Sequence, residues 1–329
     1  MERLTENKII LVKRKTRLEE LISRYNTIAQ AQFYIEHLGS DFSDYLQENE
    51  QYKKAVSDAQ GELEQLGRVQ VVDREYVPNF LFGKSDVVVA VGQDGLVANT
   101  LKYLTDQLLI GVNPDPARWD GVLLPFKVSD LRLVMQDVFK MKRPVKEVTM
   151  AKAEMNDGQT LYAVNDLFVG QKTHVSSRYR IRLGKSQEAH SSSGIIISTG
   201  LGSTGWMKSV MAGAEGIMTG ITAEAGIPGH PGAVDPVRSG GKPPKTRQKP
   251  MGWNAEYLYF SVREPFPSKT TKTDLVFGKI TRSNPLAILS QMPENGVIFS
   301  DGIETDCLQF NSGLEARITL AEKKGHLVV

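Results

Sequence analysis

Two apolar segments that each run into a glycine-bearing turn constrain the fold of this chain most. Residues 86–91 read Asp-Val-Val-Val-Ala-Val and lead into Gly-Gln-Asp-Gly at 92–95. Residues 195–198 read Ile-Ile-Ile-Ser and lead into Thr-Gly-Leu-Gly-Ser-Thr-Gly at 199–205. Short runs of β-branched residues bounded by glycine are typical of buried strands. Ligands bind at the carboxyl ends of strands in open α/β sheets, so both turns are candidate parts of a binding site.

The first part of the chain alternates between strand and helix patterns. Strands are predicted at 8–13, 69–72, 86–91 and 108–112, and helices at 16–38, 42–66 and 129–141. This alternation predicts a Rossmann-like, doubly wound parallel sheet. Pro144 cannot continue a helix and marks a boundary, so we expect an α/β nucleotide-binding domain over residues 1–144.

From residue 145 onward short strand patterns dominate. They lie at 148–154, 161–164, 179–183, 195–198, 257–262, 275–280, 286–290, 297–299 and 316–320, with one helix inserted after Gly202. This pattern predicts a mostly antiparallel, sandwich-like β domain over residues 145–329. The proline-rich and basic stretch at 226–252 predicts a mobile loop.

Composition narrows the class of protein. The chain has 329 residues and a formal net charge of +2, which is too small to indicate a nucleic-acid or membrane surface. Its single cysteine, Cys307, cannot form a disulfide within the chain. Because no apolar run is long enough for a membrane span and no leader pattern opens the sequence, we expect a cytoplasmic protein.

The turn at 92–95 offers a carboxylate at the end of a strand. Gly92 and Gly95 bracket Asp94, which allows a tight turn and lets the carboxylate project above the strand ends. Such a group can accept a proton from a sugar hydroxyl that attacks phosphorus, or it can bind a ribose hydroxyl without catalysis. Gly-X-Asp-Gly turns also join elements in many proteins, so a purely structural turn remains an alternative.

The turn at 199–205 offers hydroxyls and main-chain amides at the start of a helix over 209–214. Together with the helix dipole these groups favour an anion site. A serine or threonine N-cap would explain one hydroxyl but not three glycines in six residues. The sequence has no Gly-X-X-X-X-Gly-Lys-Ser/Thr motif and no zinc-type cluster, and we single out no metal ligand.

In order and spacing these motifs resemble those of the NAD kinases, in particular the mitochondrial-type branch, whose superfamily also includes the diacylglycerol kinases. The resemblance rests on Gly92-Gln-Asp-Gly95, Asn165-Asp166 and Thr199-Gly-Leu-Gly-Ser-Thr-Gly-Trp206, with further marks at Thr16-Arg17, Ile110–Pro116, Phe260–Pro265 and Asp301-Gly302. It spans nearly the whole chain.

The resemblance implies phosphoryl transfer from ATP, or from polyphosphate, to the 2′-hydroxyl of the adenosine ribose of NAD(H), with Mg²⁺ as cofactor. Asp94 is then the catalytic residue that activates the hydroxyl. The implied NAD-binding residues are Asn165, Asp166, Thr204, Gly205, Trp206 and Ser209. The implied phosphate- or ATP-binding residues are Gly92, Gln93, Gly95, Asn113, Thr199, Gly202 and Ser203, with phosphates resting on the amides around the glycines. A homodimer or homotetramer is also implied.

The sequence departs from the family pattern in ways that matter for these expectations. Gln93 replaces a glycine, and we expect its side chain to obstruct the donor phosphate and its backbone to be penalised at a positive φ. Asp166 is one methylene shorter than the usual glutamate. Ser193 and Trp206 replace residues of bacterial members but match the mitochondrial-type branch.

The sequence is also compatible with two other functions. Gln93 favours a catalytically weak NAD(P)-binding sensor, and the superfamily includes kinases of lipid or sugar hydroxyls. The Asn165-Asp166 pair and the match around Arg263 favour NAD as the acceptor. The sequence fixes neither the preference between NAD and NADH, nor the donor, nor the role of residues 226–252.

Overall fold

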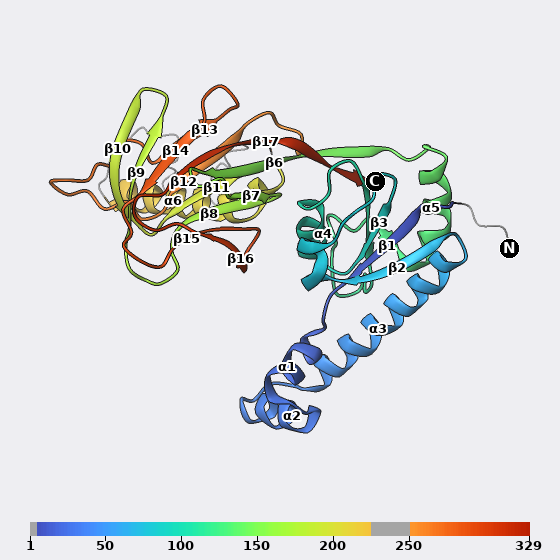
Figure 1. Cartoon of the computed structure of the whole chain (residues 1–329). Coiled ribbons are helices and arrows are strands. Elements are labelled where there is room, and N and C mark those ends of the chain that lie inside the picture. The colour runs from blue at the N-terminus through green and yellow to red at the C-terminus, as the bar shows by residue number, and fades with distance from the viewer. Residues whose placement is uncertain (1–4, 225–250) are drawn as a thin grey trace, which may run out of the picture. The chain divides into compact units, whose positions relative to one another are not determined.

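The computed structural model describes residues 5–224 and 251–329, which form two compact units (Figure 1). The first unit extends to Val148 and includes Lys323–Val329, and the second is Thr149–Glu322. The predicted boundary after residue 144 lies close to this division. The last seven residues, predicted in the second domain, belong to the first unit because His326 and Leu327 pair with Leu108 and Leu109. The predicted loop at 226–252 falls, except for its last two residues, outside the described ranges.

The first unit is built on a parallel sheet. Its strands β1 (Lys8–Lys13), β2 (Arg68–Asp73), β3 (Val87–Val91) and β4 (Leu108–Asn113) lie in the order β2-β1-β3-β4. The two-residue strand β5 (Phe126–Lys127) and the end of β17 (Glu315–Val328) also pair with β4. After β2 the chain crosses to the other side of β1. The carboxyl ends of β1 and β3 therefore form a topological switch point, the usual ligand position in such sheets.

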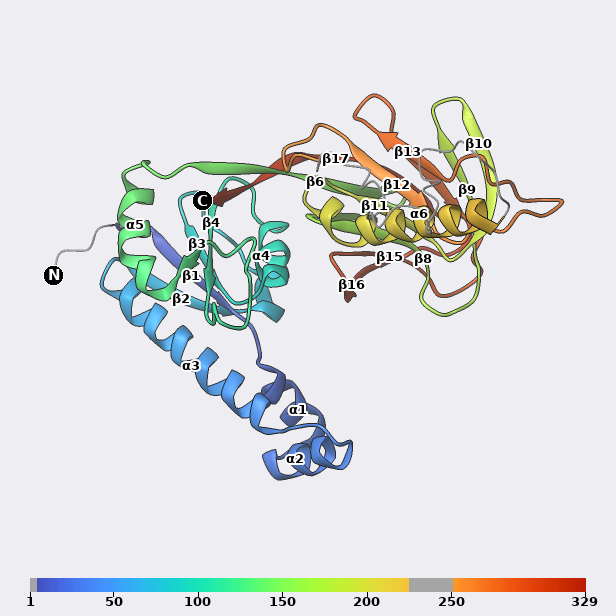
Figure 2. The same cartoon turned by 180° about the vertical axis from the view of Figure 1, so that it is seen from behind.

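Helices cover both faces of this sheet (Figure 2). Buried residues of α3 (Ser43–Glu64) and α5 (Leu131–Phe139) pack with apolar residues of β1, β3 and β4 on one face. The short helix α4 (Asp94–Leu101) lies on the other face. Short 3₁₀ turns occur at Arg74–Asn79 and Val128–Asp130. The buried faces of the parallel strands explain their continuous apolar sequences.

The single helix predicted over residues 16–38 is wrong, because two helices occupy this segment. They are α1 (Arg17–Tyr25) and α2 (Ile28–His37), separated by Asn26 with φ 67°. The Thr27 hydroxyl accepts from the Gln30 amide at 3.2 Å and caps the second helix. Asparagine tolerates the left-handed conformation and threonine favours N-caps, so local turn chemistry overrides the continuous apolar periodicity.

The second unit is an antiparallel sandwich. One sheet has the order β13 (Phe277–Ile280), β12 (Leu258–Val262), β11 (Ile195–Ser198), β8 (Asp166–Gln171), β15 (Gly296–Ser300) and β16 (Ile303–Gln309). The other contains β10 (Ser186–Ser192), β9 (Ser177–Leu183), β14 (Leu286–Ser290) and the first part of β17, with β6 (Val145–Met155) and β7 (Thr160–Ala163) beside β17.

Alternation along the strands divides the apolar residues between two layers. Leu167, Val169, Ile195 and Ile197 face the core between the sheets, where they pack with residues of the second sheet. Phe168 faces outward and packs with residues of α6 (Trp206–Glu224), which follows a 3₁₀ turn at Gly202–Thr204. The period of two in these strands accounts for both layers. The predicted fold class, a parallel α/β domain with a mostly antiparallel β domain, is confirmed.

Within the described ranges, no helix has both the length and the apolar character that crossing a membrane requires.

Candidate functional site

The turn at 92–95 in the first unit lies at the topological switch point of the parallel sheet. It follows β3 directly and leads into α4, whose first residue is Asp94. Gln93 is the N-cap residue, with φ −111° and ψ 165°. The expected backbone penalty at Gln93 is therefore wrong in this conformation, because its φ is negative and lies in the extended region open to any residue.

Two main-chain amides hold the carboxylate of Asp94. The Leu123 amide donates to Asp94 Oδ1 at 2.8 Å, and the Val122 amide donates to Oδ2 at 3.2 Å. Each carboxylate oxygen can accept more than one hydrogen bond, so this half-buried side chain retains acceptor capacity for a ligand hydroxyl. The donor loop fixes the direction of the carboxylate before any ligand is bound.

The two glycine amides of this turn differ in whether they already donate a hydrogen bond within the protein. The Gly92 amide donates to the Val112 carbonyl at 3.1 Å, so a phosphate contact at this amide would require that bond to break. Gly95 is the second residue of α4, where a helix leaves main-chain N–H groups without intrahelical acceptors. Asn113, the last residue of β4, uses its side-chain amide within its own loop, donating to Trp119 O and accepting from the Asp115 amide.

Tyr52 of α3 supports the turn and was missed by the sequence analysis. Its hydroxyl accepts from the Arg14 amide at 2.8 Å and donates to the Val91 carbonyl at 2.8 Å, which links the ends of β1 and β3. Burial raises the pKa of this hydroxyl to about 12, so it remains a donor at neutral pH. Nearby, the buried Glu48 pairs with Arg14 and Arg17, each at 2.8 Å. A buried tyrosine on a helix is usually a residue of the hydrophobic core. The sequence around Tyr52 gives no indication of its distant hydrogen-bond partners.

In the second unit, three turns meet at one edge of the sheet that contains β8. Asp166, the first residue of β8, pairs with Ser198, the last residue of β11. Leu167 pairs with Ser300, the last residue of β15, and the turn after β15 begins at Asp301. We call Asn165, Asp166, Ser198, Thr199 and Asp301 the sheet-edge cluster. The structure thus joins Asn165-Asp166 with the 199–205 turn and with Asp301.

Close main-chain contacts lock the first two of these turns together. The Thr199 amide donates to Asn165 O at 3.0 Å, and the Thr199 hydroxyl donates to Val164 O at 2.6 Å. A Cβ on Gly202 would lie 2.2 Å from Asn165 O, and a Cβ on Gly200 would lie 1.9 Å from Gly252 O. These two glycines are therefore required for a close approach of main chains, not for a positive φ.

The hydroxyls predicted to bind ligand are satisfied by nearby carbonyls in this conformation. Ser203 donates to Gly200 O at 2.8 Å, Thr204 to Leu201 O at 3.2 Å and Ser209 to Gly205 O at 3.4 Å. The amides of Gly202 and Gly205 donate to Thr199 Oγ1 and Gly202 O, at 3.1 and 2.9 Å. The expected free amide at Gly202 is not observed, because the fully buried Thr199 accepts it.

Asp166 is the electrostatically exceptional residue of the cluster. Its Oδ1 is buried and has no hydrogen-bond partner among the described residues. Burial, reinforced by the charge of Asp301 and opposed by the Ser198 hydroxyl, raises the pKa of Asp166 to about 7. A partly buried carboxyl with a raised pKa and a buried, unsatisfied oxygen is characteristic of functional sites.

Trp206 begins α6 beside this cluster. Its ring stacks on Phe168, with centroids 5.9 Å apart and planes at 13°, and the Arg263 guanidinium lies 5.6 Å from the ring centroid. The Arg263 amide donates to Gly194 O at 2.8 Å, which ties the segment after β12 to the residue before β11. These contacts fix the position of the indole at the N-terminus of the helix.

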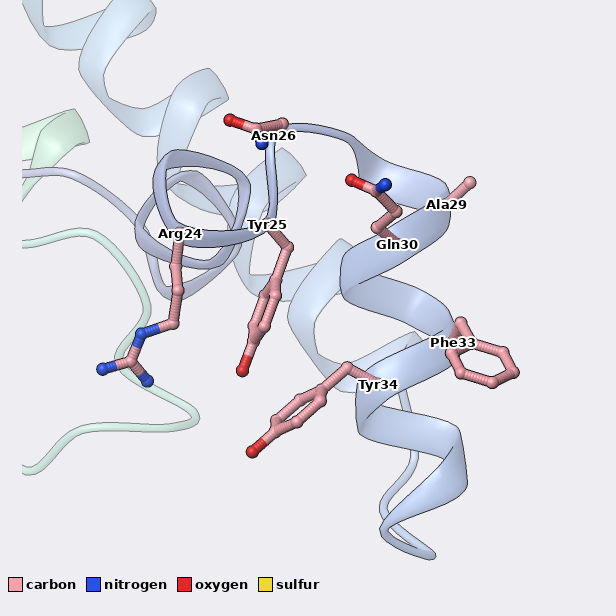
Figure 3. Close-up of a pocket in the computed structure, with 7 residues that line it drawn as sticks. All are labelled: Arg24, Tyr25, Asn26, Ala29, Gln30, Phe33 and Tyr34. Carbon is pink, nitrogen blue, oxygen red and sulfur yellow. The ribbon is translucent and has the colours of Figure 1, made fainter.

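A surface pocket of about 560 Å³ lies elsewhere, between α1 and α2 (Figure 3). Its lining includes Tyr25 and Tyr34, whose ring centroids are 4.6 Å apart, together with Arg24 and Phe33. None of the predicted site residues lines it, and it contains no carboxylate. It is not the site that the sequence motifs predict.

In the comparisons with known proteins, the chain is similar to NAD kinases. No family model matches the sequence. NAD kinase 2 of Geobacillus kaustophilus (strain HTA426) is 24% identical over 153 residues, which are 45% of this chain and 54% of the relative. The chain thus spans about half the length of this curated relative.

Two solved structures share the fold of nearly the whole chain. An NAD kinase from Archaeoglobus fulgidus in complex with ATP matches with a TM-score of 0.55 and 14% identity, over 98% of this chain and 93% of its own. Yeast NADH kinase complexed with NADH matches with a TM-score of 0.57 and 13% identity, over 99% and 84% of the two chains.

Proposed function

We propose that this chain, a member of the NAD kinase family, transfers a phosphoryl group from ATP or polyphosphate to the 2′-hydroxyl of the adenosine ribose of NAD(H). The observation that carries the proposal is the sheet-edge cluster, in which Asn165, Asp166 and the 199–205 turn meet. The motifs Asn165-Asp166 and 199–205, which lie apart in sequence, come together there around a carboxyl with one buried oxygen. The compounds named for the two solved structures, ATP and NADH, support the same two ligands.

The 92–95 turn supplies the catalytic carboxylate in this proposal. Asp94, oriented by the amides of Val122 and Leu123, accepts the proton of the attacking hydroxyl. The N-terminus of α4 at Gly95 favours the negative charge of the donor phosphates. Gln93 lines the approach to that end, and Asn113 contributes by holding the loop after β4.

The sheet-edge cluster supplies the acceptor site. Asn165 and Asp166 bind ribose hydroxyls, and Thr204, Gly205, Trp206 and Ser209 line the dinucleotide at the start of α6. The unsatisfied oxygen of Asp166 gains partners when a hydroxyl arrives. Phosphate contacts by Thr199, Gly202 and Ser203 require that some of their present hydrogen bonds exchange for ligand ones.

Magnesium is part of the proposal as a companion of the nucleotide. Among the described residues, no three or more His, Cys, Asp or Glu side chains form a group that could hold a metal ion. We therefore expect the ion to be bound mainly by the nucleotide phosphates and by water, with one carboxylate of the protein at most. Such coordination is common for Mg²⁺ in phosphoryl transfer. Bound there, Mg²⁺ neutralises charge on the transferred group.

A coupled assay of NADP(H) formation tests the function. Purified protein is supplied with NAD or NADH, Mg²⁺ and either ATP or polyphosphate. Asp94→Asn is expected to lower turnover by about 10³-fold, since it removes the proton acceptor. Asp130→Asn is the matched control, because its carboxylate also accepts a main-chain amide, that of Lys127, beside a helix start. Equal turnover in the two variants would reject Asp94 as the catalytic residue.

The same assay separates the alternatives. Binding of NAD or NADP without turnover with any donor would favour a sensor. Phosphorylation of a lipid or sugar hydroxyl, but not of NAD(H), would favour another kinase of the superfamily. The cytoplasmic location remains an expectation, and so does the homodimer or homotetramer, which light scattering tests.

A further inference from the structure

We propose that Asp301 is a positioning residue for the acceptor site: its carboxylate fixes the main chain of Val164, Asn165 and Asp166 and thereby the two side chains that bind ribose. This inference rests on the proposed function for its ligand. Neither the sequence motifs nor the comparisons give Asp301 a role.

The carboxylate of Asp301 accepts hydrogen bonds from three consecutive amides. Its Oδ1 accepts from Asn165 at 2.6 Å, from Val164 at 3.1 Å and from Asp166 at 3.3 Å, while Oδ2 accepts from Val164 at 3.1 Å. The Asp301 amide donates in return to the Asp166 carbonyl at 2.9 Å. Hydrogen bonds to an ionised acceptor are stronger than neutral ones, so this arrangement holds the 164–166 main chain firmly.

Turn chemistry alone does not explain an aspartate here. Asp301 has φ 54° and Gly302 has φ 72°, as in a two-residue hairpin. Asparagine and glycine satisfy such a turn as well as aspartate does. The negative charge is therefore explained by the three amides, which lie 135 to 137 residues away in sequence.

The 164–166 main chain is held from a second direction by Thr199. The Thr199 amide and hydroxyl donate to the carbonyls of Asn165 and Val164. Asp301 binds the amides of this segment and Thr199 binds its carbonyls, so the backbone that carries both ribose-binding side chains is fixed from two directions. Prepositioned binding groups lose less freedom when the ligand arrives, and this strengthens binding.

After burial, which is the main cause, the Asp301 charge also raises the pKa of the Asp166 carboxyl. The groups that influence the Asp166 carboxyl are the Ser198 hydroxyl on β11 and the Asp301 carboxylate after β15, in addition to burial. The pKa of Asp166 is about 7, so Asp166 takes up a proton near neutral pH. An ionised Asp166 can accept two ribose hydroxyls, whereas a protonated one must donate one hydrogen bond. The affinity for NAD(H) is therefore expected to rise as pH increases through 7.

The test compares Asp301→Asn and Asp301→Glu with wild type. Hydrogen exchange is measured in the peptide that contains residues 164–166, and NAD(H) affinity is measured by calorimetry between pH 5.5 and 8.5, about 1.5 pH units either side of the pKa. For Asp301→Asn we expect at least fivefold faster exchange and roughly tenfold weaker binding, with kcat changed by less than about threefold. The pH at which affinity rises should move lower, because a charge beside Asp166 is removed.

Asp301→Glu separates charge from position. It keeps the charge but displaces the carboxylate, so the affinity should fall while its pH dependence stays near that of wild type. The matched control is Asp157→Asn, since Asp157 also precedes a glycine of positive φ, Gly158, but its carboxylate bonds Gln159 in its own turn. The control should change neither exchange at 164–166 nor affinity.

Unchanged exchange at 164–166 in Asp301→Asn, or faster exchange with unchanged NAD(H) affinity, would overturn the proposal. If Asp301→Asn bound NAD(H) more weakly but with an unshifted pH dependence, the proposed effect of the Asp301 charge on Asp166 would be overturned. Asp301 would then have a structural role only. If wild type binds NAD(H) but forms no NADP(H), the proposed kinase function fails, yet exchange and calorimetry still decide the role of Asp301.

Discussion

Two carboxylates that the proposal uses, Asp94 in the first unit and Asp166 in the second, have opposite environments. Asp94 is half-buried, opens a helix and accepts two amides from a neighbouring loop. Asp166 has a buried oxygen without a partner among the described residues and a pKa raised to about 7. The backbone around Asp166 is nonetheless held tightly, by Thr199 and by Asp301. Both oxygens of Asp94 thus have partners within the protein, whereas Oδ1 of Asp166 has none among the described residues.

This difference indicates how the two groups act. A base must present the same acceptor geometry in each cycle, and the amides give Asp94 that geometry. A binding carboxyl with one oxygen that lacks a partner gains more from a ligand hydroxyl than a fully satisfied one does, since the ligand relieves an existing desolvation cost. We infer that the charged Asp166 lowers the stability of the folded protein and strengthens ligand binding. A substitution that removes this charge should therefore raise stability and weaken NAD(H) binding.

The largest expected effect is a gain of stability in Asp166→Asn. The pKa of Asp166 in the folded protein is raised above its ordinary value of 3.8, to about 7. Its contribution to stability is therefore complete below pH 3.8 and is lost as pH rises to 7. A tenfold change in an ionisation constant corresponds to about 1.4 kcal/mol, so a neutral asparagine should stabilise the protein at pH 8 by up to about 4 kcal/mol.

Denaturant unfolding of Asp166→Asn and wild type at pH 5 and pH 8 measures this effect. The difference between the two proteins should be larger at pH 8, and the variant should bind NAD(H) more weakly than wild type. Asp157→Asn is the control, since the pKa of this exposed carboxyl is lowered by Gln159 and its removal brings no such gain. A variant that is less stable than wild type at pH 8 would show that Asp166 is not held at an energetic cost.

The glycines of the two motifs extend the comparison. A Cβ at Gly202 would meet the Asn165 carbonyl at 2.2 Å, whereas nothing lies within 4 Å of a Cβ at Gly95. Gly202→Ala should therefore destabilise the protein by roughly 3 kcal/mol. Gly95→Ala should leave stability unchanged or raise it slightly, because alanine is the better helix residue. Thermal unfolding of both variants measures these effects.

The KM for ATP of the Gly95→Ala protein provides a second measurement. If the N-terminus of α4 receives the donor phosphates, Gly95→Ala should raise KM for ATP despite its normal stability, because the added methyl group occupies the approach to the helix. Equal stability losses in the two variants would contradict the assigned contacts. A stable Gly95→Ala protein with unchanged KM would place the donor away from Gly95.

Much of this arrangement could be predicted from local sequence. The buried runs at β3 and β11 end in the predicted turns, and the motif order resembles that of the NAD kinases, proteins that the chain also matches in the comparisons. The 199–205 turn was predicted to precede a helix, and α6 begins at Trp206. These features depend on neighbours in the chain, so periodicity and glycine spacing reveal them.

Features that depend on distant partners could not be predicted. Strand β10 reads Ser-Gln-Glu-Ala-His-Ser-Ser and carries little apolar signal, although its pairing with β9 is continuous. The amide contacts of Asp301 and the Tyr52 link between β1 and β3 join residues far apart in sequence. Gln93 was assigned a positive φ from the glycine of the family motif, whereas the helix start places it in the extended region. Local composition contains none of this information.

The smallest effect is expected for Gln93→Gly. This substitution tests the environment of Asp94, because Gln93 is its neighbour in the chain. Gln93 is an extended N-cap residue, so glycine relieves no backbone strain there. Stability should change by less than about 0.5 kcal/mol, and kcat/KM with ATP or polyphosphate by less than about tenfold. Gln93→Ala serves as the matched variant, because it removes the side chain but keeps a Cβ. A similar gain in both variants would mean that the glutamine side chain obstructs the donor. If kcat/KM rose by several orders of magnitude in Gln93→Gly alone, residue 93 would have to reach a positive φ during turnover. The amides of Val122 and Leu123 would then not hold Asp94 in its working geometry.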